Sequence, residues 1–245
     1  MTFTLAPNKS FSEDIRILRE KLNSKENFSF SKYADGEWAV MQNGSINNSE
    51  FWFDNNSVMD TMKREKLIDS FRFQHPQYYV GISCPCCQGQ NTFEAMRDFS
   101  EQHPSRLTWA NIWVNDNYKY YLSEIMPIFS SSNVVLYSNE NSKLNELPFK
   151  PKKYFPISNN AWESNWDLIE KSKEYITDYK VKDSLFLFCC GPFGNILCHE
   201  LTDFNDNNTY IDIGSTLNPF LQTGFHRQYY LQNSFWSTME CKWGE

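Results

Sequence analysis

The sequence predicts an α/β fold: a single domain over residues 1–245, built on a mostly parallel, Rossmann-like sheet with helices on both faces. Segments with strand character alternate with amphipathic helical segments along the chain, and this alternation is typical of parallel strands joined by crossover helices. The segment 184–190 is apolar at nearly every position, which indicates a strand that is buried on both faces. No repeat or low-complexity tract divides the 245 residues, so we expect one domain.

The elements can be assigned in order. The first helix, over residues 10–22, begins with the capping-box pair Ser10 and Glu13, and its apolar residues recur on one face. We expect strands at 28–33, 78–83, 108–114, 133–138, 184–190 and 210–213. We expect further helices at 57–73, 92–101, 115–125, 162–176 and 193–201. In the helix at 57–73, the residues expected to share one buried side are Met59, Met62, Leu67 and Phe71.

Composition excludes several classes of protein. The 20 Phe, 13 Tyr and 8 Trp are too many for a chain that is disordered in solution. The net charge of −7 argues against binding nucleic acid or anionic lipid by charge alone. Residues 1–10 lack the pattern of a signal peptide, and the apolar run at 185–190 is far too short for a membrane span. With seven cysteines, an odd number, we expect a reduced, cytoplasmic protein without membrane insertion.

Three segments place polar residues or glycines at predicted strand ends: 33–37, 190–195 and 211–215. In an open parallel sheet, ligands bind at the carboxyl ends of the strands. The sequence therefore predicts that these three segments form one binding site.

Asp35 and Glu37 are the first candidate ligands. If the chain stays extended through Gly36, both carboxylates project to the same side. Two such oxygen ligands suit Mg²⁺ or Mn²⁺, which would also bind a substrate diphosphate. In the alternative, Asp-Gly forms a turn and Glu37 lies in the first turn of a helix.

The segment 191–195 joins a predicted strand to a predicted helix. Its glycines, Gly191 and Gly194, allow close approach of a ligand to the backbone, and a helix N-terminus offers N–H groups to phosphate. The spacing is Gly-x-x-Gly, which is not the dinucleotide-binding fingerprint, and Pro192 removes one donor. The alternative is a tight turn between strand and helix.

Asp212 lies at the end of the last predicted strand, before Gly214 and Ser215. It is a candidate to orient a sugar hydroxyl or to act as a general base. Alternatively, Asp212 accepts hydrogen bonds from loop N–H groups and Ser215 caps a helix. Near the end of the sequence, His226 is a candidate base and Arg227 a candidate cation for phosphate.

Tryptophan and cysteine residues suggest two further possibilities. Trp109 and Trp113 are candidates to stack on a sugar or a base, although aromatic residues of an α/β fold usually lie in the core. The cysteines at 84, 86 and 87 are more crowded than the usual Cys-x-x-Cys zinc chelate. A zinc site would need further ligands, which we expect from Cys189, Cys190 or Cys198. Alternatively, these cysteines are small buried apolar residues.

In combination, the three strand-end segments resemble the bacterial glycosyltransferases of the GT-D fold, a family first described as a domain of unknown function (DUF1792). That family has a Tyr/Phe-Gly-Asp-Gly-Glu segment, which is similar to residues 33–37 here, with Ala34 in place of the first glycine. It also has strands that end in Gly-Pro-Thr-Ala and Asp-Ile-Gly-His, which resemble residues 191–194 and 212–215. Ser215 replaces the family's histidine, and the middle of the chain, including residues 84–87, matches no part of the pattern.

The resemblance implies a GT-D-like transferase in which Asp35 and Glu37 hold Mn²⁺ or Mg²⁺ and the diphosphate of a nucleotide-sugar, most simply a UDP-sugar. The catalytic residues expected are Asp35, Glu37, Asp212 and His226. The residues expected around the donor are Tyr33, Gly36, Gly191, Pro192, Gly194, Asn195, Gly214, Ser215 and Arg227.

The leading hypothesis is a metal-dependent glycosyltransferase whose acceptor is a glycan or glycoprotein, the family default. A second acceptor is a hydroxylated DNA base such as hydroxymethylcytosine, with Trp109 or Trp113 stacking on the exposed base. The alternative from another class is a non-catalytic binding module stabilised by zinc.

Overall fold

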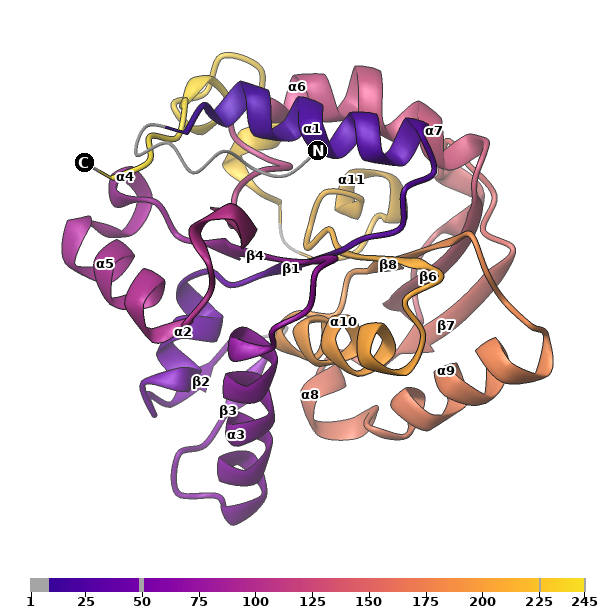
Figure 1. Ribbon diagram of the computed structural model, residues 1–245, viewed down its shortest axis with the longest axis horizontal. Coiled ribbons are helices and arrows are strands. Elements are labelled where there is room, and N and C mark those ends of the chain that lie inside the picture. Colours follow the sequence, from indigo (N-terminus) through magenta and orange to yellow (C-terminus); the bar gives the residue numbers. More distant parts are fainter. Residues whose placement is uncertain (1–8, 49–50, 225, 245) are drawn as a thin grey trace.

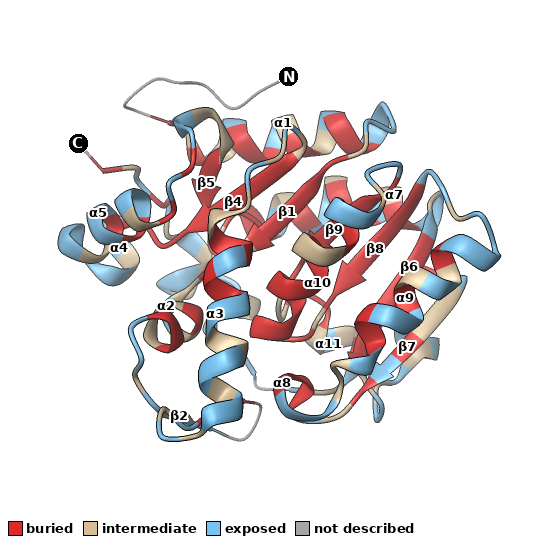
Figure 2. Ribbon diagram, turned by 60° about the horizontal axis from the view of Figure 1, so that its bottom comes forward, coloured by how far each residue is buried: buried red, intermediate tan, exposed pale blue. Residues whose placement is uncertain are grey.

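The computed structural model describes residues 9–48, 51–224 and 226–244, and in this part of the chain seven parallel strands form one sheet. Figure 1 shows the sheet nearly edge-on, and Figure 2 shows the order of its strands, β5-β4-β1-β9-β8-β6-β7. The strands are β1 (Ser29–Lys32), β4 (Tyr78–Ile82), β5 (Leu107–Trp109), β6 (Asn133–Asn139), β7 (Lys153–Ile157), β8 (Ser184–Phe188) and β9 (Thr209–Asp212). A separate antiparallel hairpin contains β2 (Ile46–Asn47) and β3 (Trp52–Phe53). The predicted fold class is confirmed.

Helices cover both faces of the sheet (Figure 1). On one face lie α2 (Asp35–Met41), α3 (Val58–Arg72), α5 (Gln90–Phe99), α8 (Ala161–Ser164), α9 (Asp167–Asp178) and α10 (Pro192–Phe204). On the other lie α1 (Phe11–Asn23), α6 (Asn117–Tyr120), a π-helical turn (Tyr121–Ile125), α7 (Met126–Ser130) and α11 (Asn218–Leu221). The short helix α4 (Pro85–Gln88) follows β4, and 3-10 turns occur at Pro104–Arg106, Leu144–Glu146, Gln228–Tyr230 and Trp236–Thr238. No helix of the described residues combines the length and the apolar character that a membrane span requires.

The central strands are buried on both faces (Figure 2). In β8, Phe186 and Phe188 pack into the core beneath α3, α9 and α10, whereas Leu185 and Leu187 pack into the core beneath α1 and α7. This two-sided burial explains why the strand has no polar alternation in its sequence.

Several boundaries differ from the prediction. β5 ends at Trp109 rather than at residue 114, because the chain then leaves the sheet edge through turns. The helix expected at 162–176 is divided into α8 and α9. β7 was not predicted, because Pro156 is unusual in a strand; as an edge strand paired only with β6, β7 tolerates a residue that has no N–H donor.

The first helix and α3 show where the apolar pattern was sufficient and where it failed. Ser10 caps α1 as predicted, since its Oγ accepts a hydrogen bond from Glu13 N at 3.3 Å. In α3, however, only the second half is buried: Met59 and Met62 are 61% and 62% exposed. The prediction of one continuous buried side was wrong for this first half, which extends beyond the core.

Candidate active site

A pocket of about 340 Å³ lies where five strands end. Its walls come from the segments that follow β1, β6, β7, β8 and β9. The volume is within the range of small-molecule sites, about 300–1,000 Å³. All three of the predicted strand-end segments contribute, so the structure brings them together as expected. The predicted residues that line the pocket are Asp35, Gly36, Glu37, Gly191, Pro192, Gly214, Ser215 and Arg227.

The chain is helical, not extended, at Asp35 and Glu37. Helix α2 starts at Asp35, and Glu37 Oε2 accepts a hydrogen bond from the Ala34 backbone N–H at 2.8 Å. Alanine has no side-chain acceptor, so the Glu37 carboxylate satisfies an N–H group that the helix itself leaves free. The extended geometry was therefore wrong, and the helical alternative is confirmed. Glu37 is 7% exposed, whereas Asp35 is exposed.

Lys32, at the end of β1, is a pocket residue that the sequence analysis missed. Burial alone would lower the pKa of its ammonium group, but the carboxylates of Glu37, Asp212 and Asp35 outweigh this effect and raise the pKa above its ordinary value. Lys32 is therefore positively charged at neutral pH. In the sequence, Lys32 could have been predicted as a site residue because it directly precedes the Tyr-Ala-Asp-Gly-Glu segment.

Asp212 lies behind this cation. It is 2% exposed, and its Oδ1 accepts a hydrogen bond from Gly214 N at 2.9 Å. Burial raises the pKa of Asp212 to about 7, with the charge of Lys32 opposing the rise and that of Glu37 adding to it. The hydrogen bond to Gly214 corresponds to the alternative predicted for Asp212, a carboxylate that binds a loop N–H group.

The turn at Gly191 offers few free donors. Gly191 has φ +55° and precedes α10. Pro192 has no N–H group, and the N–H of Gly194 donates to the Gly191 carbonyl at 2.9 Å. An anion at this place would therefore rely mainly on side-chain cations, because few backbone donors remain.

Five predicted site residues are not among the residues that line the pocket: Asp212, described above, and the four that follow. Tyr33 is fully buried and its hydroxyl donates to Ser70 Oγ at 2.9 Å. Asn195 is buried and donates to the Lys32 carbonyl, so it supports the end of β1. Gly194 packs beneath the site, since a Cβ there would lie 3.3 Å from Phe188 Cβ. His226 is exposed and lies against the ring of Tyr230.

The opposite wall contains polar residues that were not predicted. Ser138 and Asn139 end β6, and Ser158 and Asn159 follow β7. Among the described residues, the buried Ser138 Oγ has no hydrogen-bond partner. In the sequence, this wall could have been predicted from the two Ser-Asn pairs, each of which follows a run of mostly apolar residues.

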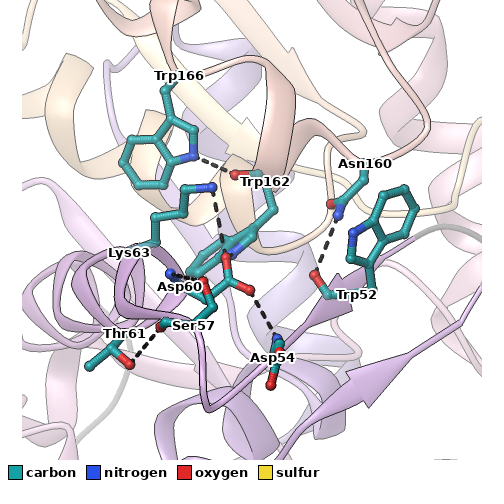
Figure 3. Close-up of polar contacts among 9 residues, drawn as sticks. All are labelled: Trp52, Asp54, Ser57, Asp60, Thr61, Lys63, Asn160, Trp162 and Trp166. Atoms are coloured by element: carbon teal, nitrogen blue, oxygen red, sulfur yellow. Dashed lines mark hydrogen bonds and ion pairs between the residues drawn. The ribbon is translucent and has the colours of Figure 1, made fainter.

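The hairpin wall of the pocket is attached to α3 and α8 (Figure 3). Asp60 Oδ2 accepts from Asp54 N at 2.9 Å, and Asp60 Oδ1 accepts from Trp162 Nε1 at 3.3 Å. Trp162 in turn packs edge-on against Phe51, which lines the pocket, with ring centroids 5.7 Å apart. Asn160 Nδ2 donates to the Trp52 carbonyl. Asp60, on α3, thus connects the end of the hairpin to α8.

The predicted aromatic platform does not exist. Trp109 and Trp113 are 0% and 1% exposed, and they pack edge-on against Phe11 and Phe30 respectively. The core alternative, which the sequence favoured for both residues, is confirmed, and neither ring is accessible for stacking on a base or sugar. The DNA hypothesis loses the feature on which it depended.

The expected source of further ligands for a zinc site was wrong. Cys84, Cys86 and Cys87 are joined by Cys241, and not by Cys189, Cys190 or Cys198. Cys189 and Cys190 line the pocket instead, and Cys198 is buried in α10.

The carboxylates of Asp35 and Glu37 are oxygen donors of the kind that a divalent cation takes, although residues two apart on a helix do not share one face. Both residues line the pocket, and Mg²⁺ and Mn²⁺ prefer carboxylate oxygens, with water and substrate phosphates filling the other positions. One oxygen of Glu37 is held by Ala34 N, so the exposed Asp35 offers the more accessible carboxylate.

Comparison with known proteins supports the fold. No family model and no curated protein sequence matches the chain. Two solved structures do. One is described as a selenomethionine-substituted domain of unknown function 1792, with 16% identity. The other, with 14% identity, is described by the statement that this highly conserved domain has a distinct glycosyltransferase fold. In both cases the TM-score is 0.55, and the match covers 82% of this chain and 77% of the other.

This chain has the DUF1792 fold. The likeness covers far more than the short segments from which the resemblance was inferred, and the predicted resemblance is confirmed at the level of the fold. In the DUF1792 fold of this chain, the pocket lies at the carboxyl edge of the sheet, the place at which parallel α/β sheets bind ligands.

Proposed function

We propose that the chain is a glycosyltransferase that moves a sugar from a nucleotide-sugar to an acceptor hydroxyl. The observation that carries this proposal is the pairing of carboxylates and cations in one pocket of a glycosyltransferase-like fold: Asp35 and Glu37 with Lys32 and Arg227.

The cations suit the diphosphate of the donor. Lys32 ends β1 and Arg227 approaches from the segment after α11. Ammonium and guanidinium groups bind phosphate oxygens through charge-assisted hydrogen bonds. These two groups would hold the leaving nucleoside diphosphate, whose negative charge grows as the bond to the sugar breaks.

Asp35 and Glu37 would hold Mn²⁺ or Mg²⁺, which neutralises charge on a leaving diphosphate. The polar wall formed by Ser138, Asn139, Ser158 and Asn159 offers hydroxyl and amide groups for hydroxyls of the donor. Asp212 has a positioning role in this proposal, because it binds Gly214 N and lies beside Lys32 without lining the pocket.

The experiment that tests this function is thermal unfolding with a panel of nucleotide-sugars, each with Mn²⁺ or with EDTA. A donor that binds only the folded protein at about 100 times its dissociation constant adds about 2.7 kcal/mol to the free energy of unfolding. We expect one nucleotide class to raise Tm in wild type, and the Lys32→Met variant to lose most of this rise. Incubation of that donor with glycan acceptors then shows transfer by mass spectrometry. Equal Tm with every donor in both proteins would contradict the proposal.

A further inference from the structure

Four cysteines meet outside the pocket. Cys84, Cys86 and Cys87 lie at the start of α4, directly after β4, and Cys241 comes from a segment 154 residues later than Cys87. All four sulfur atoms lie within 4.8 Å of one another. The Sγ atoms of Cys84 and Cys86 are 2.8 Å apart, and those of Cys87 and Cys241 are 3.9 Å apart. Four thiolates around Zn²⁺, each at about 2.3 Å from the metal, would be separated by about 3.8 Å. The Cys87–Cys241 pair matches this separation, and the Cys84–Cys86 pair would open by about 1 Å on binding.

Nitrogen donors surround the sulfurs. Asn111 Nδ2 is 3.2 Å from Cys87 Sγ, Asn115 Nδ2 is 3.4 Å from Cys241 Sγ, and the Lys242 backbone N–H is 3.4 Å from Cys86 Sγ. Uncharged thiols are weak acceptors that do not need such partners. Metal-bound thiolates carry negative charge, and N–H donors around them orient the ligands and stabilise the complex. This second observation is independent of the clustering itself.

The set of ligands selects the metal. Four sulfurs favour a soft ion with tetrahedral geometry and leave no open position for a substrate, which is the pattern of structural zinc. Cys84 and Cys87 are in fact spaced as Cys-x-x-Cys, with Cys86 between them. None of the four cysteines lines the pocket. The cluster therefore has a role separate from donor binding.

We propose that Cys84, Cys86, Cys87 and Cys241 bind one structural Zn²⁺ that attaches the segment around residue 241 to the turn after β4. On binding, four thiols lose their protons to solvent and four Zn–S bonds form, with no change of oxidation state. In the same segment, Trp243 packs against Phe93 and Trp109, with ring centroids 5.0 Å apart in each case. The metal would secure these contacts.

The first test is elemental analysis of the full chain, purified without chelator. We expect about one zinc per chain, and replacement by Co²⁺ should give the visible absorption of tetrahedral cobalt thiolate. Cys241→Ser should reduce the zinc content well below one. Cys198→Ala, which removes a buried cysteine outside the cluster, should keep it.

A milder variant covers the possibility that Cys241→Ser fails to fold. Asn111→Ala removes a donor to Cys87 and retains all four ligands. It should weaken zinc affinity by about 10–100-fold, measured by competition with a chelator. A wild-type protein that contains no zinc and takes up none from added Zn²⁺ would overturn the proposal. So would a disulfide among these cysteines in the freshly purified protein. Neither result depends on nucleotide-sugar binding, so failure here is distinct from failure of the proposed function.

Discussion

A methyl group on Gly214 would lie 2.9 Å from Cε of Lys32. Gly214 has φ +53°, and its N–H group is bound by Asp212. One loop residue therefore contacts the side chain of the pocket cation and the buried carboxylate beside it. The backbone at this position therefore packs closely against the end of the Lys32 side chain.

Gly214→Ala should damage both stability and donor binding. The left-handed conformation costs an alanine about 1–2 kcal/mol, and the new methyl group must displace Lys32. We expect a lower midpoint in urea unfolding and a smaller rise of Tm with nucleotide-sugar. Gly36→Ala is the control for unfolding without ligand only: a Cβ there meets no atom within 4 Å, but Gly36 also lines the pocket. Equal unfolding midpoints for the two variants would contradict this account.

The pKa of Asp212 predicts a pH-dependent stability. Its folded-state pKa is about 7 against an ordinary value of 3.8, so between pH 4 and 7 the folded protein binds more protons than the unfolded chain. The free energy of unfolding contributed by this group is therefore highest below pH 4 and falls as pH rises through 7. Asp212→Asn, which is uncharged at every pH, should remove this part of the decrease. Urea unfolding of both proteins at pH 5 and pH 8 measures it, and parallel pH profiles would exclude the effect.

Asp35 and Glu37 should differ in their effect on stability. Asp35→Ala removes an exposed carboxylate and should leave the unfolding midpoint unchanged while it abolishes any Mn²⁺-dependent response to donor. Glu37→Ala also removes the acceptor for Ala34 N and should lower the free energy of unfolding by about 1 kcal/mol. Chemical unfolding without ligand separates the two roles. A destabilised Asp35→Ala protein would show that this carboxylate is structural.

Asp60→Ala should loosen the hairpin wall. The change leaves Asp54 N and Trp162 Nε1 without the acceptor that now binds both. The bond from Asp54 N is exposed and the bond from Trp162 Nε1 is only partly buried, so their loss should cost about 1 kcal/mol. Donor affinity should fall because Phe51 rests on Trp162. Asp69→Ala, on the exposed side of the same helix, is the control. Calorimetry and donor titration of both variants check this, and unchanged affinity in Asp60→Ala would assign Asp60 to stability alone.

The predictable part of the fold is the part set by local pattern. The apolar run of β8 and the Ser10 cap of α1 need no distant contact to be recognised. By contrast, β7 contains Pro156, which only its place at the sheet edge makes acceptable. Met59 and Met62 follow a helical pattern, yet they remain exposed, because in the described part of the chain no element packs against them.

For the site, the sequence located the three strand ends but not every group that meets there. Lys32 acquires its role from carboxylates that come from α2 and β9. Cys241 joins the other cysteines only after the sheet has brought its segment back to α4. Such residues depend on long-range arrangement, which spacing along the chain does not express. The conformation at Glu37 was undecided because a carboxylate two residues after another suits both an extended chain and a helix start.

The place of β9 in the sheet has a consequence during synthesis. β9 lies between β1 and β8, although it is the last of the seven described strands in the chain. Until residues 209–212 leave the ribosome, β1 and β8 each have an unpaired edge, and the halves β5-β4-β1 and β8-β6-β7 have no shared ladder. Unpaired edges of a nascent chain are sites of aggregation. The insertion of four residues, Thr209–Asp212, unites the halves, and the same step delivers Asp212 to its position beside Lys32.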